Sequence, residues 1–144
     1  TLKSRCINYK IFLNYNNVIN VTNKLLDDDV FNHINKDLLN YYSTPGKIIR
    51  LISFFESNSY DLKKYNLKDF LKLIIKDSLY KKNLDIKNIL FEYVELFFRK
   101  NISNIKINPF DSYNYFIKKI SDTKKFNLDE ESLFMEFEYK ILNG

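Results

Sequence analysis

The sequence predicts an all-α protein, and three observations support this prediction. Apolar residues recur at spacings of three and four along most of the chain, as one buried face of a helix requires. Gly and Pro number only two each, too few for the many tight turns of a β-sandwich or barrel. Hydrophobic residues make up 45% of the 144 residues, which is enough to build a core. We therefore expect helices packed against one another as a bundle.

The chain up to residue 42 predicts an extended segment followed by two short helices. Residues 6–13 are β-prone and partly alternating, which indicates a strand or an extended entry. Asn16 or Asn17 can cap the first helix, whose apolar side carries Val18, Val21, Leu25 and Leu26. The aspartates at 27–29 can open the second, because carboxylates favour the positive end of a helix dipole. The apolar side of this second helix carries Phe31, Ile34, Leu38 and Tyr42.

A Pro-Gly pair marks the start of a third short helix. Thr44 suits the cap, and Pro45 suits the first helical position, where an N–H has no partner within the helix. The apolar side of this helix carries Ile48, Leu51, Ile52 and Phe55. Residues 57–59, Ser-Asn-Ser, form the best candidate linker in the chain, so we divide the chain here.

Beyond the linker, the patterns predict four longer helices. They begin at Asn66, at about Leu84, at Asn108 and at Asn127, and the second runs to Asn101. Their apolar stripes are, in order, Leu67, Phe70, Leu71 and Ile74; Ile86, Ile89, Leu90, Tyr93, Val94 and Phe97; Phe110, Tyr113, Ile117 and Ile120; Leu133, Phe134, Phe137 and Ile141.

Charge, cysteine content and hydropathy restrict the function classes. The net charge of +5 permits contact with nucleic acid, but no run of five or six like charges marks a binding tail. A solvated, lysine-rich surface is the simpler interpretation. The single cysteine, Cys6, excludes an intrachain disulfide and fits a reducing compartment such as the cytoplasm. No apolar stretch reaches the length of a membrane span, so we expect no membrane association. The chain lacks an initial Met, and we expect it to be a fragment.

Few residues offer chemistry of their own. The single histidine, His33, falls on the polar side of the predicted second helix, where we expect it to be solvated. The acidic clusters at 27–29 and 129–131 fall in first helical turns, where they cap helices. Aromatic pairs could stack on nucleic-acid bases, but each has one member on an apolar stripe, so core packing is expected of Tyr41-Tyr42, Phe54-Phe55 and Phe97-Phe98. We expect no metal site, no bound cofactor and no complete active site.

Two short motifs stand above this background. Thr1-Leu2-Lys3-Ser4-Arg5-Cys6 runs into the extended segment, and Thr44-Pro45-Gly46-Lys47 opens the third helix. The first is similar to the signature that ends the ATPase core in AAA+ clamp-loader subunits. The second resembles the Ser-Pro-Gly-Arg-Ala element in the lid of the δ′ type of these subunits, which belongs to bacterial DNA polymerase III. Lys47 stands where that element has arginine, and Ile48 where it has a small residue.

The resemblance implies a division into three parts. Residues 1–13 would end the AAA+ ATPase core, 14–57 would form a three-helix lid, and 58–144 a collar bundle of four to five helices. In this family five collars associate into a ring, so the γ/τ and δ subunits would be partners through the collar. The sliding clamp and primer–template DNA would be reached through the complex. The resemblance thus implies a cytoplasmic assembly subunit, or stator, of a DNA-directed DNA polymerase in DNA replication.

The resemblance also implies one catalytic group. Arg5, within the motif Ser4-Arg5-Cys6, would act as an arginine finger on ATP–Mg bound by the neighbouring subunit. A guanidinium suits this role, because it is always charged and its fork can contact two phosphate oxygens. A δ′-type chain binds no nucleotide, so Lys47 would have no phosphate to contact. Two alternatives stay open: a γ/τ-type ATPase subunit, and a free-standing basic helical domain that binds nucleic acid.

Overall fold

The computed structural model describes residues 13–40, 43–101 and 108–143, and within these ranges all regular structure is helical, which confirms the all-α prediction. The expected extended segment at 6–13 lies outside the described residues, apart from Leu13. The α-helices are α1 (Tyr15–Leu26), α2 (Pro45–Ser57), α3 (Leu67–Lys76), α4 (Leu79–Lys82), α5 (Leu84–Asn101), α6 (Pro109–Phe126) and α7 (Glu130–Phe137). Shorter elements are the 3-10 turns η2 (Val30–Asn32), η3 (Lys36–Leu38) and η4 (Leu62–Lys64), and the π turn η6 (Glu138–Leu142).

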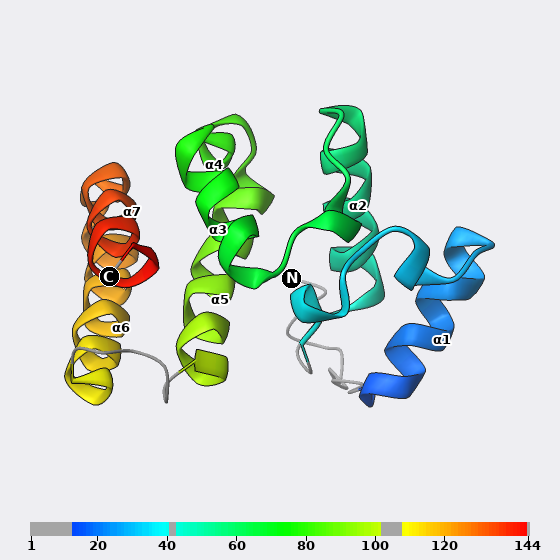
Figure 1. Ribbon diagram of the computed structural model, residues 1–144, viewed down its shortest axis with the longest axis horizontal. Helices are drawn as coiled ribbons and strands as arrows, with labels where there is room; N and C mark the ends of the chain where they lie inside the picture. The colour runs from blue at the N-terminus through cyan, green and yellow to red at the C-terminus, as the bar shows by residue number, and fades with distance from the viewer. Residues whose placement is uncertain (1–12, 41–42, 102–107, 144) are drawn as a thin grey trace, which may run out of the picture.

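The helices form three neighbouring groups along the long axis of the molecule (Figure 1). Helices α1 and α2 lie at one end, α3, α4 and α5 in the middle, and α6 and α7 at the other end. Helix α5 contacts α3 and α4 within its own group and α6 in the next. It is therefore the element around which the middle and C-terminal groups pack.

Buried apolar side chains form a core that runs through all three groups. Phe55 of α2 packs on Phe70 of α3 with ring centroids 5.3 Å apart, and Phe70 packs on Tyr93 of α5 at 5.0 Å. The core thus crosses the predicted division at residues 57–59. Helix α2, which the resemblance assigns to the lid, is anchored to helices assigned to the collar.

Three helices match their predicted buried faces. The predicted stripes of α2, α3 and α5 are all buried. Asn66 caps α3 by accepting a hydrogen bond from the Asp69 N–H at 2.9 Å. The observed α5 has the predicted bounds. These helices satisfy the periodic pattern because each is packed along its full length.

The helix predicted over residues 27–42 is wrong. Residues 27–40 form a loop that contains the two turns η2 and η3. Asp27 ends α1 in the left-handed conformation, with φ 55°. Asp29 and Asn35 each accept a hydrogen bond from the backbone N–H two residues ahead, and such local bonds compete with a continuous helix. The turns still bury two of the predicted apolar residues, Ile34 and Leu38.

The first helix begins before its predicted cap. Asn14, rather than Asn16 or Asn17, caps α1 by accepting a hydrogen bond from the Asn17 N–H at 2.8 Å. Within α1 the buried positions are Val18 and Thr22, whereas the predicted apolar residues Val21 and Leu25 are exposed. Among the described elements, α1 packs mainly on α2 and η2, and these contacts cover only a narrow side of it.

The C-terminal helices also depart from the prediction at their ends. Asn127 ends α6 in the left-handed conformation, and Asp129 caps α7 in its place. The π turn η6 directs the residue five positions after Phe137 into the core, so Leu142 is buried and Ile141 only half-buried. In α6, the predicted Phe110 is exposed, and the buried aromatic is Phe116. The pattern did not predict α4, which buries Leu79 and Tyr80.

The aromatic cluster at the C-terminal end supports a first prediction. The fully buried ring of Phe137 lies 5.3 Å from that of Phe116 and 5.8 Å from that of Phe98. Replacement of Phe137 by Ala should cost about 3–5 kcal/mol of unfolding free energy, because it leaves a cavity between three helices. Urea unfolding followed by circular dichroism measures this loss. Tyr139→Ala is the control: this exposed ring should change stability by less than about 0.5 kcal/mol. Equal losses would contradict the packing described.

Candidate functional site

The Thr44–Lys47 element opens α2 in the geometry predicted for it. Thr44 Oγ1 accepts a hydrogen bond from the Lys47 N–H at 3.3 Å, and Pro45 stands at the start of the helix. Gly46 has an ordinary helical φ, and an added Cβ there would meet nothing within 4 Å. Glycine is therefore not required at this position by backbone geometry or by close packing within the described part of the chain.

Lys47 joins α2 to α5. Its Nζ lies 2.6 Å from Glu92 Oε1, and the two side chains are 40% and 43% exposed. An ion pair with this exposure adds no more than about 1 kcal/mol to stability. The ion pair therefore follows from the packing of α2 against α5 and does not determine it.

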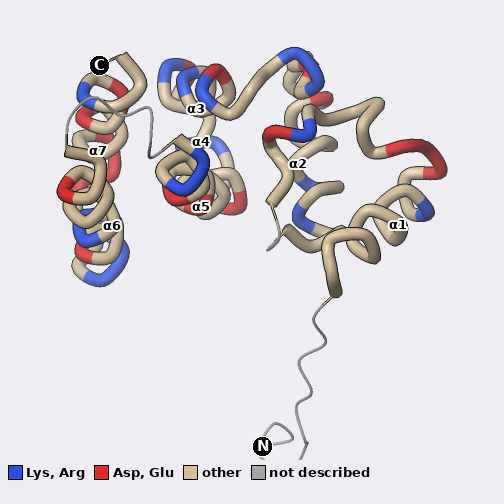
Figure 2. Tube along the Cα trace, turned by 60° about the horizontal axis from the view of Figure 1, so that its bottom comes forward, with Lys and Arg blue, Asp and Glu red and all other residues tan. Residues whose placement is uncertain are grey.

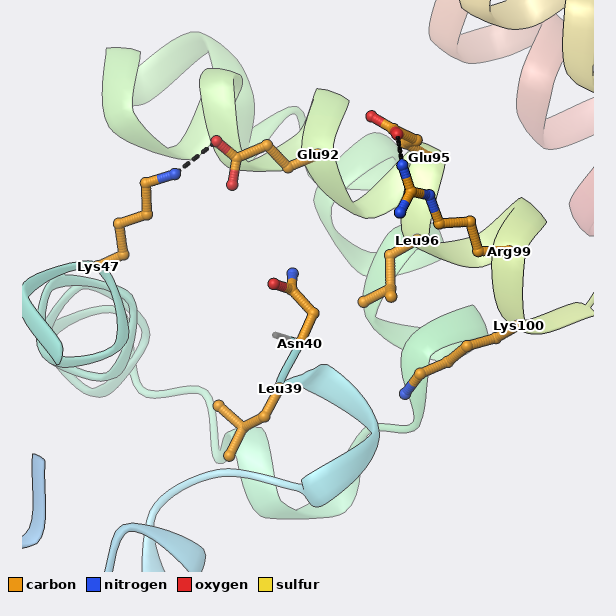
Figure 3. A pocket seen from close by; sticks show the side chains of 8 residues that line it. All are labelled: Leu39, Asn40, Lys47, Glu92, Glu95, Leu96, Arg99 and Lys100. Carbon is orange, nitrogen blue, oxygen red and sulfur yellow. Dashed lines mark hydrogen bonds and ion pairs between the residues drawn. The ribbon is translucent and has the colours of Figure 1, made fainter. Parts of the chain in front are cut away.

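A cavity of about 400 Å³ lies beside this ion pair, between α5 and the loop that precedes α2 (Figure 3). In Figure 3 the side chains of Asn40 and Leu96 extend toward the space between α2 and α5, and Lys47 meets Glu92 at one side of it. The lining residues are Leu39, Asn40, Lys47, Glu92, Glu95, Leu96, Arg99 and Lys100.

Charges around the cavity are paired with one another. Arg99 pairs with Glu95 within α5, and Lys100 Nζ lies 2.8 Å from the carboxylate of Asp37. Burial raises the pKa of Asp37, but hydrogen bonds from Lys100 and from the Leu67 N–H outweigh it and hold that pKa below its usual value. The lining set contains no histidine, cysteine or hydroxyl nucleophile.

His33 lies at the surface, with 29% of its side chain exposed, and it bridges two carboxylates that the sequence did not predict. Its Nδ1 lies 3.0 Å from Glu56 Oε1 at the end of α2, and its Nε2 lies 3.1 Å from Asp28 Oδ2. A neutral imidazole has only one N–H, so both carboxylates accept a hydrogen bond only when the ring is protonated. The hydrogen bond to Glu56 raises the pKa of His33 most, burial opposes it, and the bond to Asp28 adds to the increase.

This bridge predicts that stability decreases as the pH rises. A group whose pKa is raised on folding contributes its stability below the unfolded value of about 6.5 and loses it as the pH passes the folded value. Because the chain has one histidine, proton NMR of the His33 ring reports its titration without ambiguity. We expect a pKa above that of an unfolded control peptide, and a loss of this pH dependence in His33→Gln. A pKa at or below that of the peptide would contradict the bridge.

A second charge cluster joins α6 to α7. Glu136 accepts hydrogen bonds from Lys119, from Lys140 Nζ at 2.6 Å and from the Tyr115 hydroxyl at 2.9 Å. Burial raises the pKa of Glu136, but these three donors outweigh it and lower the pKa to about 2. The carboxylate is saturated by its donors, so this cluster fixes the two helices and offers no free base.

Several predicted residues can now be placed. Phe55 is fully buried with Phe54 packed against the core, and Phe97 and Phe98 are both buried, so core packing is confirmed for these two pairs. Asp129 caps α7, with acids in its first turn, as expected. The motif Ser4-Arg5-Cys6 and the pair Tyr41-Tyr42 lie outside the described residues.

Within the described ranges, no group of three or more His, Cys, Asp or Glu side chains is arranged to hold a metal ion. Among the helices of residues 13–40, 43–101 and 108–143, none combines the length and apolar character needed to cross a membrane.

The partners that shape these sites were not predicted from the sequence. Lys47 and Glu92 are 45 residues apart, and His33 and Glu56 are 23 apart. No local spacing marks such pairs, because they meet only when helices pack. Comparison of the chain with models of protein families, with curated protein sequences and with solved structures found no match.

Proposed function

We propose that this chain is the lid and collar part of a δ′-like clamp-loader subunit, which acts as an assembly scaffold in DNA replication. The observation that carries the proposal is the Thr44–Lys47 element, which opens α2 as the resemblance implies. Lys47 is held by Glu92 at 2.6 Å and so is already neutralised. A side chain engaged in this way suits a subunit that binds no nucleotide, and therefore the δ′ type over the γ/τ ATPase type.

In this proposal Arg5 supplies a catalytic group to a neighbouring subunit. Its guanidinium would contact ATP–Mg on a neighbouring γ/τ subunit and stabilise the negative charge that develops on the transferred phosphoryl group. Because the arginine comes from a different subunit than the one that binds ATP, ATP hydrolysis would depend on assembly of the complex. The helical part of the chain would then hold Arg5 in position.

Substitution of Arg5 tests this role. In the complete protein, Arg5→Ala should leave the loader assembled and lower its DNA-stimulated ATP turnover. Arg5→Lys should lower it as well, since an ammonium cannot form the two-pronged contact of a guanidinium. Lys3→Ala removes a charge from the same motif and should leave turnover unchanged. Steady-state ATPase assays on the reconstituted complex measure all three, and normal turnover with Arg5→Ala would remove the finger assignment.

The proposed partner surface lies at the α6–α7 end. Met135 of α7 and Tyr139 of η6 stand four residues apart and are 60% and 78% exposed. Other large apolar side chains of this end are also exposed: Phe110, Tyr115, Phe126 and Leu128. Aromatic and methionine side chains are enriched in protein interfaces, so the exposed pair Met135 and Tyr139 supports this choice of surface. We expect the collars of γ/τ and δ subunits to pack here.

A double substitution tests the surface. Met135→Ser with Tyr139→Ser should weaken association with the γ/τ and δ subunits by at least about tenfold, because it removes two exposed anchors without opening the core. The matched control is Leu25→Ser, which changes a side chain with 63% exposure at the opposite end of the molecule. Sedimentation or size-exclusion analysis of the mixed subunits separates the two. Disruption by Leu25→Ser alone would place the interface on α1.

A further inference from the structure

Lysines without a partner are concentrated in one short part of the structure. Most described Lys and Arg side chains form an ion pair or lie over an aromatic ring. Within the described ranges the exceptions are Lys24, Lys63, Lys68, Lys72, Lys76, Lys82 and Lys118. Four of these seven fall between residues 63 and 76, so the unpaired positive charge gathers in η4 and α3.

Lys68, Lys72 and Lys76 form a stripe along α3. Their spacing of four residues places them on one side of the helix, over a length of about 12 Å. The apolar side of α3 is buried in the core, so this stripe faces away from it. Figure 2 shows basic segments recurring along α3 and in the connection that precedes it. We call these three residues the lysine stripe.

Carboxylates close in sequence to the lysine stripe are engaged by other donors. Asp69 accepts a hydrogen bond from the Asn66 side-chain amide at 2.7 Å, and Asp77 accepts one from the Tyr60 hydroxyl at 2.8 Å. Neither carboxylate forms an ion pair with the stripe in the described part of the chain. The charge of the stripe is therefore available to an anion from outside the molecule.

We infer that the lysine stripe binds the phosphate backbone of nucleic acid. Phosphates of one strand follow one another at about 3.4 Å along the axis of a duplex, so a length of about 12 Å covers three to four of them. Each lysine can neutralise one phosphate. Since lysine ammonium groups contact phosphates as point charges, the contact is independent of sequence.

An anionic membrane is the competing partner for such a stripe, and α3 does not suit it. A helix that lies on a membrane needs an exposed apolar face to enter the lipid. In α3, Leu67, Phe70, Leu71, Ile74 and Ile75 are buried, and Leu73 packs against the core. Charge without an apolar face favours nucleic acid. The inference is independent of the proposed loader role of Arg5, so either can fail alone.

A charge-matched comparison tests the inference. Fluorescence anisotropy with a labelled duplex DNA measures binding by the 144-residue chain over a range of NaCl concentrations. Replacement of Lys68, Lys72 and Lys76 by Gln should weaken binding at low salt by about tenfold or more. It should also reduce the slope of log Kd against log [NaCl] by about 2.7, because each phosphate contact contributes about 0.9.

The control variant carries Lys24→Gln, Lys82→Gln and Lys118→Gln, which removes the same charge from three equally unpaired lysines elsewhere. This control variant should keep most of the affinity for DNA and most of the slope of log Kd against log [NaCl]. Equal losses in the two triple variants would overturn the inference, because overall charge would then explain the binding. No binding by the unmodified chain would overturn it too. Binding to phosphatidylserine vesicles but not to DNA would assign the stripe to membranes instead.

Folding of the variants is checked separately. None of the six lysines has an ion pair to lose in the described structure, so helix content and melting temperature should match those of the unmodified chain by circular dichroism. A stripe variant that is folded and still binds DNA with the full salt slope would refute the contact.

Discussion

The ring contacts among Phe55, Phe70 and Tyr93 are the constraint on which the rest of the structure depends. They join α2 to α3 and α5 across the position where the sequence has its best linker. The Tyr93 hydroxyl is buried and donates a 2.6 Å hydrogen bond to the Leu38 carbonyl. One aromatic side chain thus anchors two helices and the loop before α2, and loss of that hydroxyl would remove a buried hydrogen bond.

This junction determines what the surface charges can do. Because α2 is fixed against α5, Lys47 meets Glu92, and the loop that carries Asp37 meets Lys100. Each of these pairs is worth little in free energy where it is exposed, so the pairs follow the core and do not create it. In the proposed function, the same anchoring would let the collar determine the position of the segment that carries Arg5.

Sequence reasoning succeeded where one long side of a helix is buried and failed where the chain turns. Helices α2, α3 and α5 kept their predicted faces, because each packs along its whole length. The loop over residues 27–40 carried the same apolar spacing, but Asp29 and Asn35 bond to their own backbone and stop a helix from forming. The π turn after Phe137 shifts the buried position by one residue, and no spacing rule shows this in advance. Partners such as Glu92 depend on packing between distant segments.

The sequence alone does not show which lysines are unpaired and lie on one surface. Along the sequence they are scattered, and no run of five or six like charges appears in the chain. Two structural features make Lys68, Lys72 and Lys76 a candidate binding surface. The opposite face of α3 is buried, so the three lysines share the outer side of the helix. The carboxylates close to them in sequence, Asp69 and Asp77, accept hydrogen bonds from other donors. Charge that is paired within the fold, as around Glu136, stabilises helix contacts and is not available to a partner. Unpaired charge at helical spacing is therefore a better indication of a binding surface than net charge, and in this chain it occurs on α3.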